Sequence, residues 1–315
     1  MCYSIFRGNH FAACIVCERL SAHMRFAYLI MAHHRFDVLK MLLTDLDDQD
    51  NDIFLHIDQK TQNVPIEELK QCVRFSNLIF VDRIPVYWGH SSQIQCVLNL
   101  LKAATDHAHY DYYHLLVGVE FPLMSQEKIR RFFLENQGKE FIGFVQKHGY
   151  EERIKYFYLW TKYQRDHRTL GKKILFHLGR VLLAAQKKIG VNRLKHEPEY
   201  YRKGYANWSI TDALARFFVE NTQEIMKKCR WSFCADEVCF HTLVYHSRFM
   251  ENVYDEQDEY HSAMRITTWE DKHNQLHFDD VPMLMKSGRL FARKFDDEMA
   301  TQTISEIIRM RDQVN

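Results

Sequence analysis

The strongest structural signal in this chain is the apolar run Phe26–Ala32, with the sequence FAYLIMA. Seven hydrophobic residues in a row, without alternation, are typical of a parallel strand that is buried on both faces. Three further runs of strand length follow it along the chain: Ile53–Ile57, Leu78–Val81 and Tyr112–Val117. Together these runs predict the central strands of an α/β sheet.

Helical patterns separate these strands, with apolar residues recurring every three or four positions. The alternation of strands and helices predicts a mostly parallel, Rossmann-like sheet flanked by helices on both faces. The predicted helices span 38–46, capped by Asp37, and about 91–108, with further helices opened by Ser125 and near Thr211, and strand-like runs at Phe141–Val145 and Leu290–Asp296.

Composition excludes several classes of protein. The 315 residues are 46% hydrophobic and carry a formal net charge of +1, which argues against a disordered chain and against a dedicated nucleic-acid binder. The 11 glycines form neither a dinucleotide-binding fingerprint nor a P-loop. No apolar run approaches the roughly 18 residues that a membrane-spanning helix needs.

The eight cysteines stand mostly alone inside apolar runs, a pattern typical of small buried side chains in a reducing compartment. Cys14 and Cys17 form a C-x-x-C pair, but no second pair lies at zinc-site spacing, so a metal site there is disfavoured. Residues 1–23 do not read as a signal peptide. Because Met24 directly precedes the first strand, we interpret residues 1–23 as a non-native or disordered extension.

The net charge of the whole chain is close to zero, but the middle of the chain is basic. Residues 151–203 contain 14 Lys or Arg and five acids, a local charge of +9. Within them, apolar residues from Ile174 to Ala185 form a helical stripe among lysines and arginines. Two interpretations stay open: a basic amphipathic helix that lies on an anionic bilayer, or an ordinary packed helix with a solvated face.

Polar residues directly follow several predicted strands, where an α/β protein exposes its functional groups. Each group alone is also a common turn or helix cap. Because four of them fall on the same edge of one sheet, we interpret them together as a candidate binding site. They are His33–His34, Asp58–Lys60, Trp88–Ser91 and Gly118–Leu123.

The second half of the chain adds carboxylates and cations. Asp236 is a good helix N-cap, and Glu237 in the first turn suits the helix dipole, so capping alone would account for both. Arg293 and Lys294 lie within an apolar, strand-like segment. Partly buried cations need an anionic partner, and a phosphate group is a natural candidate.

Seven short motifs occur in an order that resembles the core-2/I-branching β-1,6-N-acetylglucosaminyltransferase family, which also includes the peptide-O-xylosyltransferases. The resemblance spans about residues 25–300, and the missing anchor and lack of evident disulfides are similar to the bacterial branch. The motifs are Ala27–Ile30 with His33, His56–Lys60, Trp88–Gly89, Gly118 with Phe121–Leu123, Lys203–Gly204 with Ala206 and Trp208, Asp236–Glu237, and Phe291–Asp296.

This resemblance implies a GT-A type fold that transfers sugars with inversion, by a single displacement and with no obligatory metal or other cofactor. By position, Glu237 matches the family's catalytic base, and Lys294 with Arg293 matches the group that binds the donor diphosphate. Arg265 and His277 are both candidates for a further basic residue on the diphosphate.

The resemblance also implies a nucleotide pocket and a sugar pocket. Glu120 stands where the family usually has aspartate and Tyr205 where it has serine, which bears on the identity of the sugar. The nucleotide-binding candidates are His33, Asp58 and Lys60, and the candidates for the donor and acceptor sugars are Trp88, Glu120, Gly204, Trp208, Asp236 and Glu152.

These observations predict a single catalytic domain over 24–315, with a nucleotide-binding half at 24–145, a basic, membrane-facing insertion at 146–203 and an acceptor and diphosphate-binding half at 204–315. The expected reaction moves GlcNAc from a UDP-sugar to a glycan hydroxyl in bacterial surface polysaccharide synthesis. The expected location is the cytoplasm, peripherally on the inner face of the membrane, with a lipid-linked oligosaccharide as acceptor. The alternatives are UDP-xylose or another UDP-sugar as donor, and a non-catalytic glycan-binding or scaffold protein.

Overall fold

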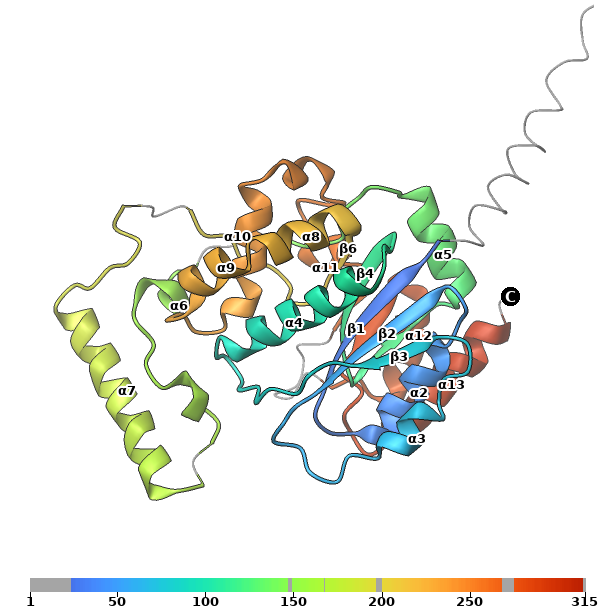
Figure 1. The fold of residues 1–315 in the computed structure, drawn as a ribbon, viewed down its shortest axis with the longest axis horizontal. Helices are drawn as coiled ribbons and strands as arrows, with labels where there is room; N and C mark the ends of the chain where they lie inside the picture. Colours follow the sequence, from blue (N-terminus) through green and yellow to red (C-terminus); the bar gives the residue numbers. More distant parts are fainter. Residues whose placement is uncertain (1–23, 147–148, 167, 197–199, 268–274, 314–315) are drawn as a thin grey trace, which may run out of the picture.

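A five-stranded sheet with the order β3-β2-β1-β4-β6 forms the centre of the structure (Figure 1). The computed structural model describes residues 24–146, 149–166, 168–196, 200–267 and 275–313. The first four strands pair in parallel, and β6 is antiparallel to β4. The strands are β1 (Phe26–Ala32), β2 (Asn51–Ile57), β3 (Asn77–Phe80), β4 (Tyr112–Val117) and β6 (Ser209–Thr211).

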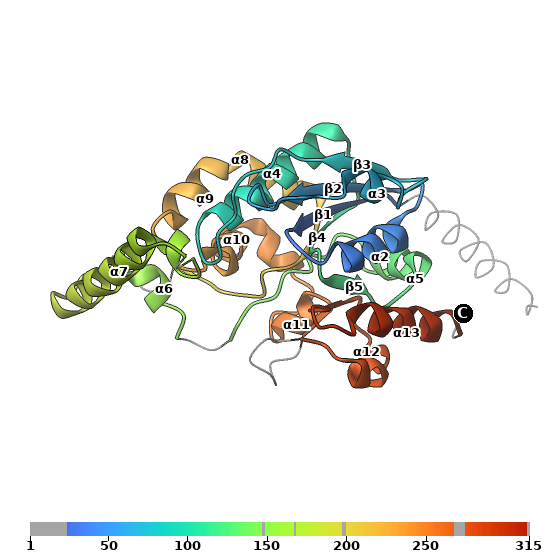
Figure 2. The same ribbon diagram turned by 90° about the horizontal axis from the view of Figure 1, so that it is seen from below.

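Helices cover both faces of this sheet (Figure 2). Phe26, Tyr28 and Ile30 of β1 belong to a hydrophobic core shared with α2 and α5, whereas Ala27 and Leu29 belong to a second core shared with α4 and α8. The strand is hydrophobic throughout because both of its faces are covered, which confirms the predicted α/β class. The covering helices are α2 (Phe36–Leu46), α4 (Ser92–His107), α5 (Gln126–Glu135) and α8 (Asp212–Glu220).

A second, three-stranded sheet has the order β5-β8-β7 and was not predicted as a sheet. Its strands are too short to produce a periodic pattern in the sequence. The C-terminal helix α13 contributes Ile304 and Ile307 to the same core as β1, so the end of the chain packs near its first strand. These elements are β5 (Glu120–Pro122), β7 (Arg265–Ile266), β8 (Phe291–Arg293) and α13 (Ala300–Gln313).

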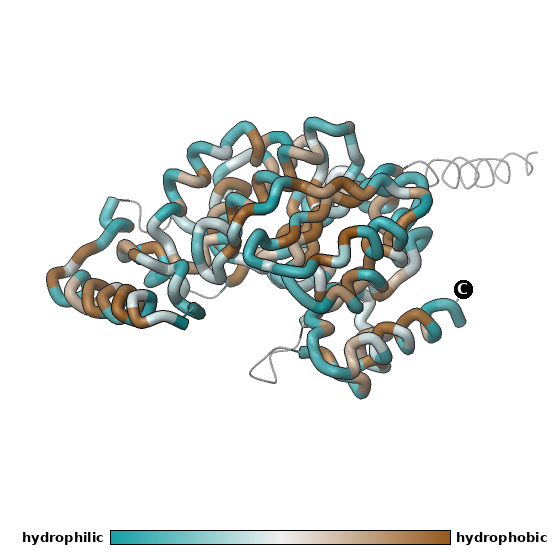
Figure 3. The backbone as a smooth tube through the Cα atoms, turned by 60° about the horizontal axis from the view of Figure 1, so that its bottom comes forward, coloured by the Kyte–Doolittle hydropathy of each residue, from teal (hydrophilic) through white to brown (hydrophobic). Residues whose placement is uncertain are grey.

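Helix α7 (Leu170–Lys188) extends from the edge of the molecule, and its hydrophobic residues recur along the exposed tube (Figures 1 and 3). In the ranges described above, no helix is both long enough and apolar enough to cross a bilayer. The remaining elements are α3 (Ile66–Lys70), α6 (Glu152–Lys155), α9 (Thr222–Cys229), α10 (Cys239–Tyr245), α11 (Glu259–Ser262), α12 (Val281–Lys286) and the 3₁₀ turns η1 (Thr161–Tyr163), η2 (Ala235–Glu237), η3 (Arg248–Asn252) and η4 (Phe278–Asp280).

Two local predictions about strands and caps were wrong. Phe141–Val145 is no strand; only Phe141 forms an isolated bridge, to Ser209. Arg35 rather than Asp37 is the N-cap of α2, and Asp37 instead pairs with Arg35 inside the first turn. Ser125 and Thr211 do cap α5 and α8, since each side chain accepts a hydrogen bond from a backbone N–H of the first turn.

The cysteine prediction also needs a correction. Cys229 at the end of α9 and Cys239 at the start of α10 form a disulfide, although we expected single buried thiols. Ten residues separate them, and nothing in that spacing distinguishes a crosslink from two buried side chains. Cys14 and Cys17, like all of residues 1–23, lie outside the described residues.

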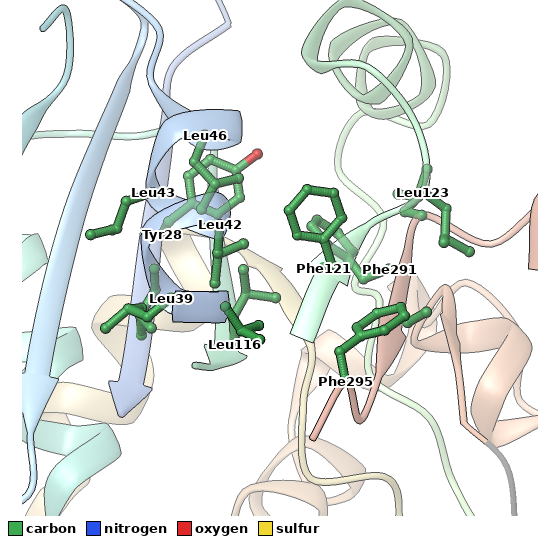
Figure 4. Packing of buried hydrophobic residues seen from close by; sticks show 14 of the residues in the cluster. Tyr28, Leu39, Leu42, Leu43, Leu46, Leu116, Phe121, Leu123, Phe291 and Phe295 are labelled. Carbon is green, nitrogen blue, oxygen red and sulfur yellow. The ribbon is translucent and has the colours of Figure 1, made fainter. Parts of the chain in front are cut away.

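The main core joins the two sheets (Figure 4). Tyr28 and the leucines of α2 lie on one side, and Phe121 of β5 and Phe291 of β8 face them from the other. All of these side chains are completely buried. The second sheet is therefore held in place by hydrophobic packing against α2.

Truncating Phe121 tests this packing. Phe121→Ala removes a ring that is 0% exposed and leaves a cavity between α2 and β8, so we expect the free energy of unfolding to fall by about 3–5 kcal/mol. The matched control is Phe75→Ala, because Phe75 is 71% exposed and its loss is expected to change stability by less than about 0.5 kcal/mol. Urea denaturation of both variants measures the difference; equal midpoints would contradict this account of the core.

Candidate functional site

A pocket of about 480 Å³ opens at the carboxyl ends of β1, β2 and β4. His33 and His34 follow β1, Asp58 follows β2, and Gly118 and Val119 follow β4, and all five line the pocket. The strand order reverses between β1 and β4, because the chain first builds outward from β1 through β2 and β3 and then returns to the other side of β1. Ligands of open α/β sheets bind at such a switch point.

Asp58 and Lys60 form one wall of this pocket. The Lys60 ammonium lies 3.1 Å from Asp58 Oδ2 and 4.1 Å above the ring centre of Tyr87. Asp58 Oδ1 accepts hydrogen bonds from the backbone N–H of Lys60 at 2.9 Å and of Val86 at 3.4 Å. The wall therefore presents a cation, a fixed carboxylate and an aromatic ring side by side.

Trp88 and the basic segment also line the pocket. The indole of Trp88 is 41% exposed, packs edge-on against Phe233 with ring centres 5.3 Å apart, and lies 3.7 Å from the Arg165 guanidinium carbon. Lys162 and Arg168 also line the pocket. Part of the +9 segment thus surrounds the pocket with positive charge, a role that its sequence did not suggest.

A second polar cluster contains Glu237. The Oε2 atom of Glu237 lies 2.6 Å from Arg153 Nη1 and 3.2 Å from Lys203 Nζ, and the side chain is 30% exposed. Burial raises the pKa of neighbouring Asp236 to about 6, with a further contribution from the negative charge of Glu237. The two adjacent carboxyl groups therefore have different surroundings: Glu237 is paired with two cations, whereas Asp236 is partly buried and has the raised pKa. Neither caps a helix: both lie in η2, and Val238 precedes α10.

Gln93 joins this cluster to the pocket. Gln93 lines the pocket, and its Nε2 donates a hydrogen bond to Asp236 Oδ2 at 3.3 Å. The backbone N–H of Cys234 donates to the carbonyl of Gly89 at 3.0 Å, which fixes the η2 segment beside the residues that follow Trp88. The carboxylates predicted from the second half of the chain and the pocket predicted from the first half are therefore adjacent.

A buried polar chain runs beneath these groups. Arg265 Nε lies 2.9 Å from Glu120 Oε1, and both side chains are 0% exposed. Glu120 Oε2 accepts a hydrogen bond from Asn207, whose Oδ1 accepts one from Arg293 Nη1 at 2.9 Å. Burial raises the pKa of Glu120, and the charges of Arg265 and Arg293 oppose that rise. Arg265 and Glu120 do not reach a surface open to a ligand, which fits a supporting role rather than the direct contacts we predicted.

The segment with Arg293 and Lys294 passes alongside the pocket. The backbone N–H of Phe295 donates to the carbonyl of Val119 at 2.9 Å, and His34 Nε2 is 2.8 Å from Asp296 Oδ1. Val119 and His34 both line the pocket. The structure thus brings Lys294 and Arg293, predicted to bind a diphosphate, next to the strand ends that were predicted to bind a nucleotide.

Three other residues predicted for the sugar pocket, Trp208, Glu152 and Gly204, make contacts with other parts of the protein. Trp208 is completely buried and packs against Phe218 and Phe240 in the core. Glu152 points to α7, where it pairs with Lys187 at 2.9 Å.

Gly204 allows a close backbone approach: a Cβ there would lie 1.7 Å from the carbonyl oxygen of Gly143. Its N–H donates to the carbonyl of Glu237 at 2.9 Å, so Gly204 positions the η2 segment.

The sequence analysis did not single out several residues that the structure brings to the site. They come from separate parts of the chain, among them helices α4 and α6 and the segment around η1, and only folding brings them together. His277, the other candidate for the second base, is paired with Asp297 at 2.7 Å. Within the described ranges, no group of three or more His, Cys, Asp or Glu side chains is placed to hold a metal ion. The additional site residues are Gln93, Lys162, Arg165 and Arg168. Arg153, Lys203 and Asn207 also belong to the site, and they lie within or beside segments that carried the family resemblance.

Comparisons with known proteins identify relatives. The chain is 22% identical over 314 residues to a xylosyltransferase of Ciona intestinalis, covering 90% of this chain and 34% of the relative. It is 28% identical over 118 residues to a mouse N-acetyllactosaminide β-1,6-N-acetylglucosaminyl-transferase, covering 36% of this chain and 29% of that protein. The chain thus spans about a third of the length of these curated relatives.

Among solved structures, it is similar to the apo form of mouse xyloside xylosyltransferase 1, with a TM-score of 0.36 and 11% identity over 85% of this chain and 96% of that one. The Core-2/I-branching enzyme family matches residues 26–284, from the first strand to helix α12. That match includes the pocket at the strand ends and Glu237 but ends before Arg293 and Lys294, and it confirms the resemblance to this family. The chain therefore belongs to the Core-2/I-branching enzyme family.

Proposed function

We propose that this protein is a glycosyltransferase that moves a sugar from a UDP-sugar to a hydroxyl group of a glycan acceptor. The observation that supports it most is the hydrogen bond between Gln93 and Asp236, because it places the carboxylate pair at the edge of the pocket at the strand ends. A transferase needs these two parts side by side: a pocket for the nucleotide and a base within reach of the sugar's reacting carbon.

The proposed base is Glu237. Both of its cationic partners contact Oε2, and we assign Oε1 to the acceptor hydroxyl. In the proposed step, Glu237 takes the hydroxyl proton while that oxygen forms a bond to the anomeric carbon. The bond between this carbon and the diphosphate oxygen breaks at the same time, so the configuration inverts in a single displacement.

The leaving UDP needs positive charge, which side chains can supply. Lys294 and Arg293 lie beside the pocket, and Lys60, Lys162, Arg165 and Arg168 line it. Fixed cations that are aimed at a developing anion stabilise the transition state without the help of a metal ion. This charge distribution supports a mechanism with no obligatory metal.

Two donors are proposed, and the relatives favour neither alone. UDP-GlcNAc corresponds to the mouse β-1,6-N-acetylglucosaminyl-transferase, and UDP-xylose to the Ciona xylosyltransferase, which matches over more of this chain. Tyr205, which stands where the family has serine, is buried, and its ring centre lies 5.3 Å from the Arg293 guanidinium carbon. The role in bacterial surface polysaccharide synthesis stays a prediction from the sequence.

Replacing the proposed base is the direct test of catalysis. Glu237→Gln keeps the shape of the side chain but cannot accept the proton, so we expect kcat to fall by about 10²–10⁴-fold. UDP affinity should change less than about twofold, since Glu237 belongs to the acceptor side. The matched control is Glu220→Gln at the exposed end of α8. Unchanged turnover in Glu237→Gln would instead support the non-catalytic, glycan-binding alternative.

The identity of the nucleotide and the need for metal can be tested by thermal shift. We expect UDP to raise the apparent Tm while GDP does not, because a ligand that binds only the folded state stabilises it by mass action. UDP-GlcNAc and UDP-xylose are compared in the same screen. Turnover that EDTA abolishes and Mn²⁺ restores would contradict the metal-free mechanism.

The diphosphate site is tested by Lys294→Gln. Loss of one fixed cation near the leaving group is expected to lower kcat by about 10²-fold. The control is Lys139→Gln, which removes an exposed cation in the loop after α5. Steady-state kinetics separate the two; equal kcat values would remove Lys294 from the proposed mechanism.

A further inference from the structure

Helix α7 presents a hydrophobic face to solvent. None of its 19 residues is buried, and six large apolar side chains on or just after the helix are exposed. Val181 is 64% exposed and Ile174 is 50% exposed, although side chains of this kind are normally covered in a folded protein. The exposed apolar residues are Leu170, Ile174, Leu178, Val181, Leu182 and Ile189.

These residues share one side of the helix. Ile174 and Leu178 lie one turn apart, Val181 and Leu182 follow on the next turn, and Leu170 begins the same row. The opposite side faces the protein: the side chain of Gln186 accepts a hydrogen bond from the backbone of Phe157 at 2.8 Å and donates one to it at 2.9 Å. Helix α7 thus presents a continuous apolar face to solvent, and its other side already contacts the protein.

The charge of the helix is entirely positive. Between Leu170 and Lys188 the sequence contains five Lys or Arg residues and no Asp or Glu. Lys172 pairs with Asp166 at 2.6 Å and Lys187 with Glu152 at 2.9 Å, so two of the cations contact the protein. The other three, Lys173, Arg180 and Lys188, are exposed, and Lys173 and Arg180 lie two turns apart along one edge of the apolar face.

We propose that α7 docks this protein on an anionic lipid surface, lying in the plane of the headgroups with its apolar face toward the acyl chains. An apolar face bordered by cations binds such a surface through buried hydrocarbon together with attraction to acidic lipids. A helix of 19 residues is roughly 28 Å long, enough for several headgroups along its length. A protein partner of ordinary composition carries charges of both signs, and binding to it would not account for the absence of acidic residues from α7.

The docked helix would also orient the pocket. The 3₁₀ turn η1 and the residues after it connect α7 to the pocket, and Lys162, Arg165 and Arg168 of this connection line the pocket wall. A lipid surface bound by α7 therefore lies at a fixed position relative to the pocket. Resting on the proposed function, this position favours an acceptor that is itself attached to a lipid.

Vesicle binding by the full chain tests the docking directly and needs no knowledge of donor or acceptor. Vesicles of phosphatidylglycerol and phosphatidylcholine should bind the protein in a flotation assay, and vesicles of phosphatidylcholine alone should bind it much less. The triple variant Lys173→Gln, Arg180→Gln, Lys188→Gln should weaken binding about a hundredfold, at roughly fivefold or about 1 kcal/mol for each cation. The triple variant Ile174→Ser, Leu178→Ser, Val181→Ser should weaken it at least as much.

The matched control removes three exposed cations elsewhere, with Lys102→Gln on α4, Arg131→Gln on α5 and Lys286→Gln on α12. Its net charge equals that of the first triple variant, so retained binding shows that position rather than total charge matters. Because the substituted side chains are exposed, all variants should melt within a few degrees of the parent. Two results would overturn the proposal: binding that is unchanged in both α7 variants, or a dimer in sedimentation that the serine variant dissociates while no vesicle is bound. Neither result would contradict the proposed function, because sugar transfer to a soluble acceptor does not require α7 to bind lipid.

Discussion

The ion pair between Arg265 and Glu120 is the interaction on which the arrangement of this site depends. Both side chains are completely excluded from solvent, and an unpaired charge in that position would cost several kcal/mol. Glu120 lies in β5, directly after Gly118 and Val119, which line the pocket, and Arg265 lies in β7 of the same small sheet. Their pairing joins the two outer strands of the second sheet, and Arg265 Nη2 also donates a hydrogen bond at 3.1 Å to Ser209 Oγ in β6 of the first sheet. This buried arginine therefore adds a polar link between the two sheets to the hydrophobic packing against α2.

From this pair, hydrogen bonds extend through Asn207 to Arg293. Arg293 ends β8 and precedes Lys294, and the next residue, Phe295, is held by the carbonyl of Val119 in the pocket wall. These side chains are largely buried, so a change of conformation would break a hydrogen bond or the ion pair where water cannot easily replace it, which favours a rigid arrangement. Arg293, assigned together with Lys294 to the leaving diphosphate, is thus held in place through Asn207 and the buried ion pair.

The basic middle of the chain serves two surfaces. Its first part, with Lys162, Arg165 and Arg168, lines the pocket, whereas α7 directs its cations and its apolar face to solvent. Positive charge in the pocket suits a nucleotide diphosphate, and positive charge beside exposed hydrocarbon suits an acidic lipid surface. The segment that the sequence presents as a single basic insertion therefore divides in the structure into a part that lines the pocket and a helix that faces outward.

The sequence by itself determined the elements with strong local signals. The four parallel strands and helices α2, α4 and α5 were predictable, because hydrophobic runs and helical periodicity report local burial. The site could be predicted in part: the residues after β1 and β2, and Glu237 and Lys294 by resemblance, belong to compact motifs.

Only the tertiary structure decided which of these residues meet. Gln93 lies in α4, Arg153 in α6 and Arg165 after η1, and no sequence pattern indicates that they meet. The strands β5 and β7 are too short for periodicity, and the run that contains β8 was predicted as strand-like without any sign of its partners. Arg265 and Trp208 look like functional residues in the sequence but are buried. Tertiary structure was also needed for α7. From its amphipathic stripe alone, an ordinary packed helix and a helix on a membrane surface were equally compatible with the sequence. A stripe records which side of a helix is apolar, and only the fold shows that the apolar side of α7 has no protein against it within the described residues.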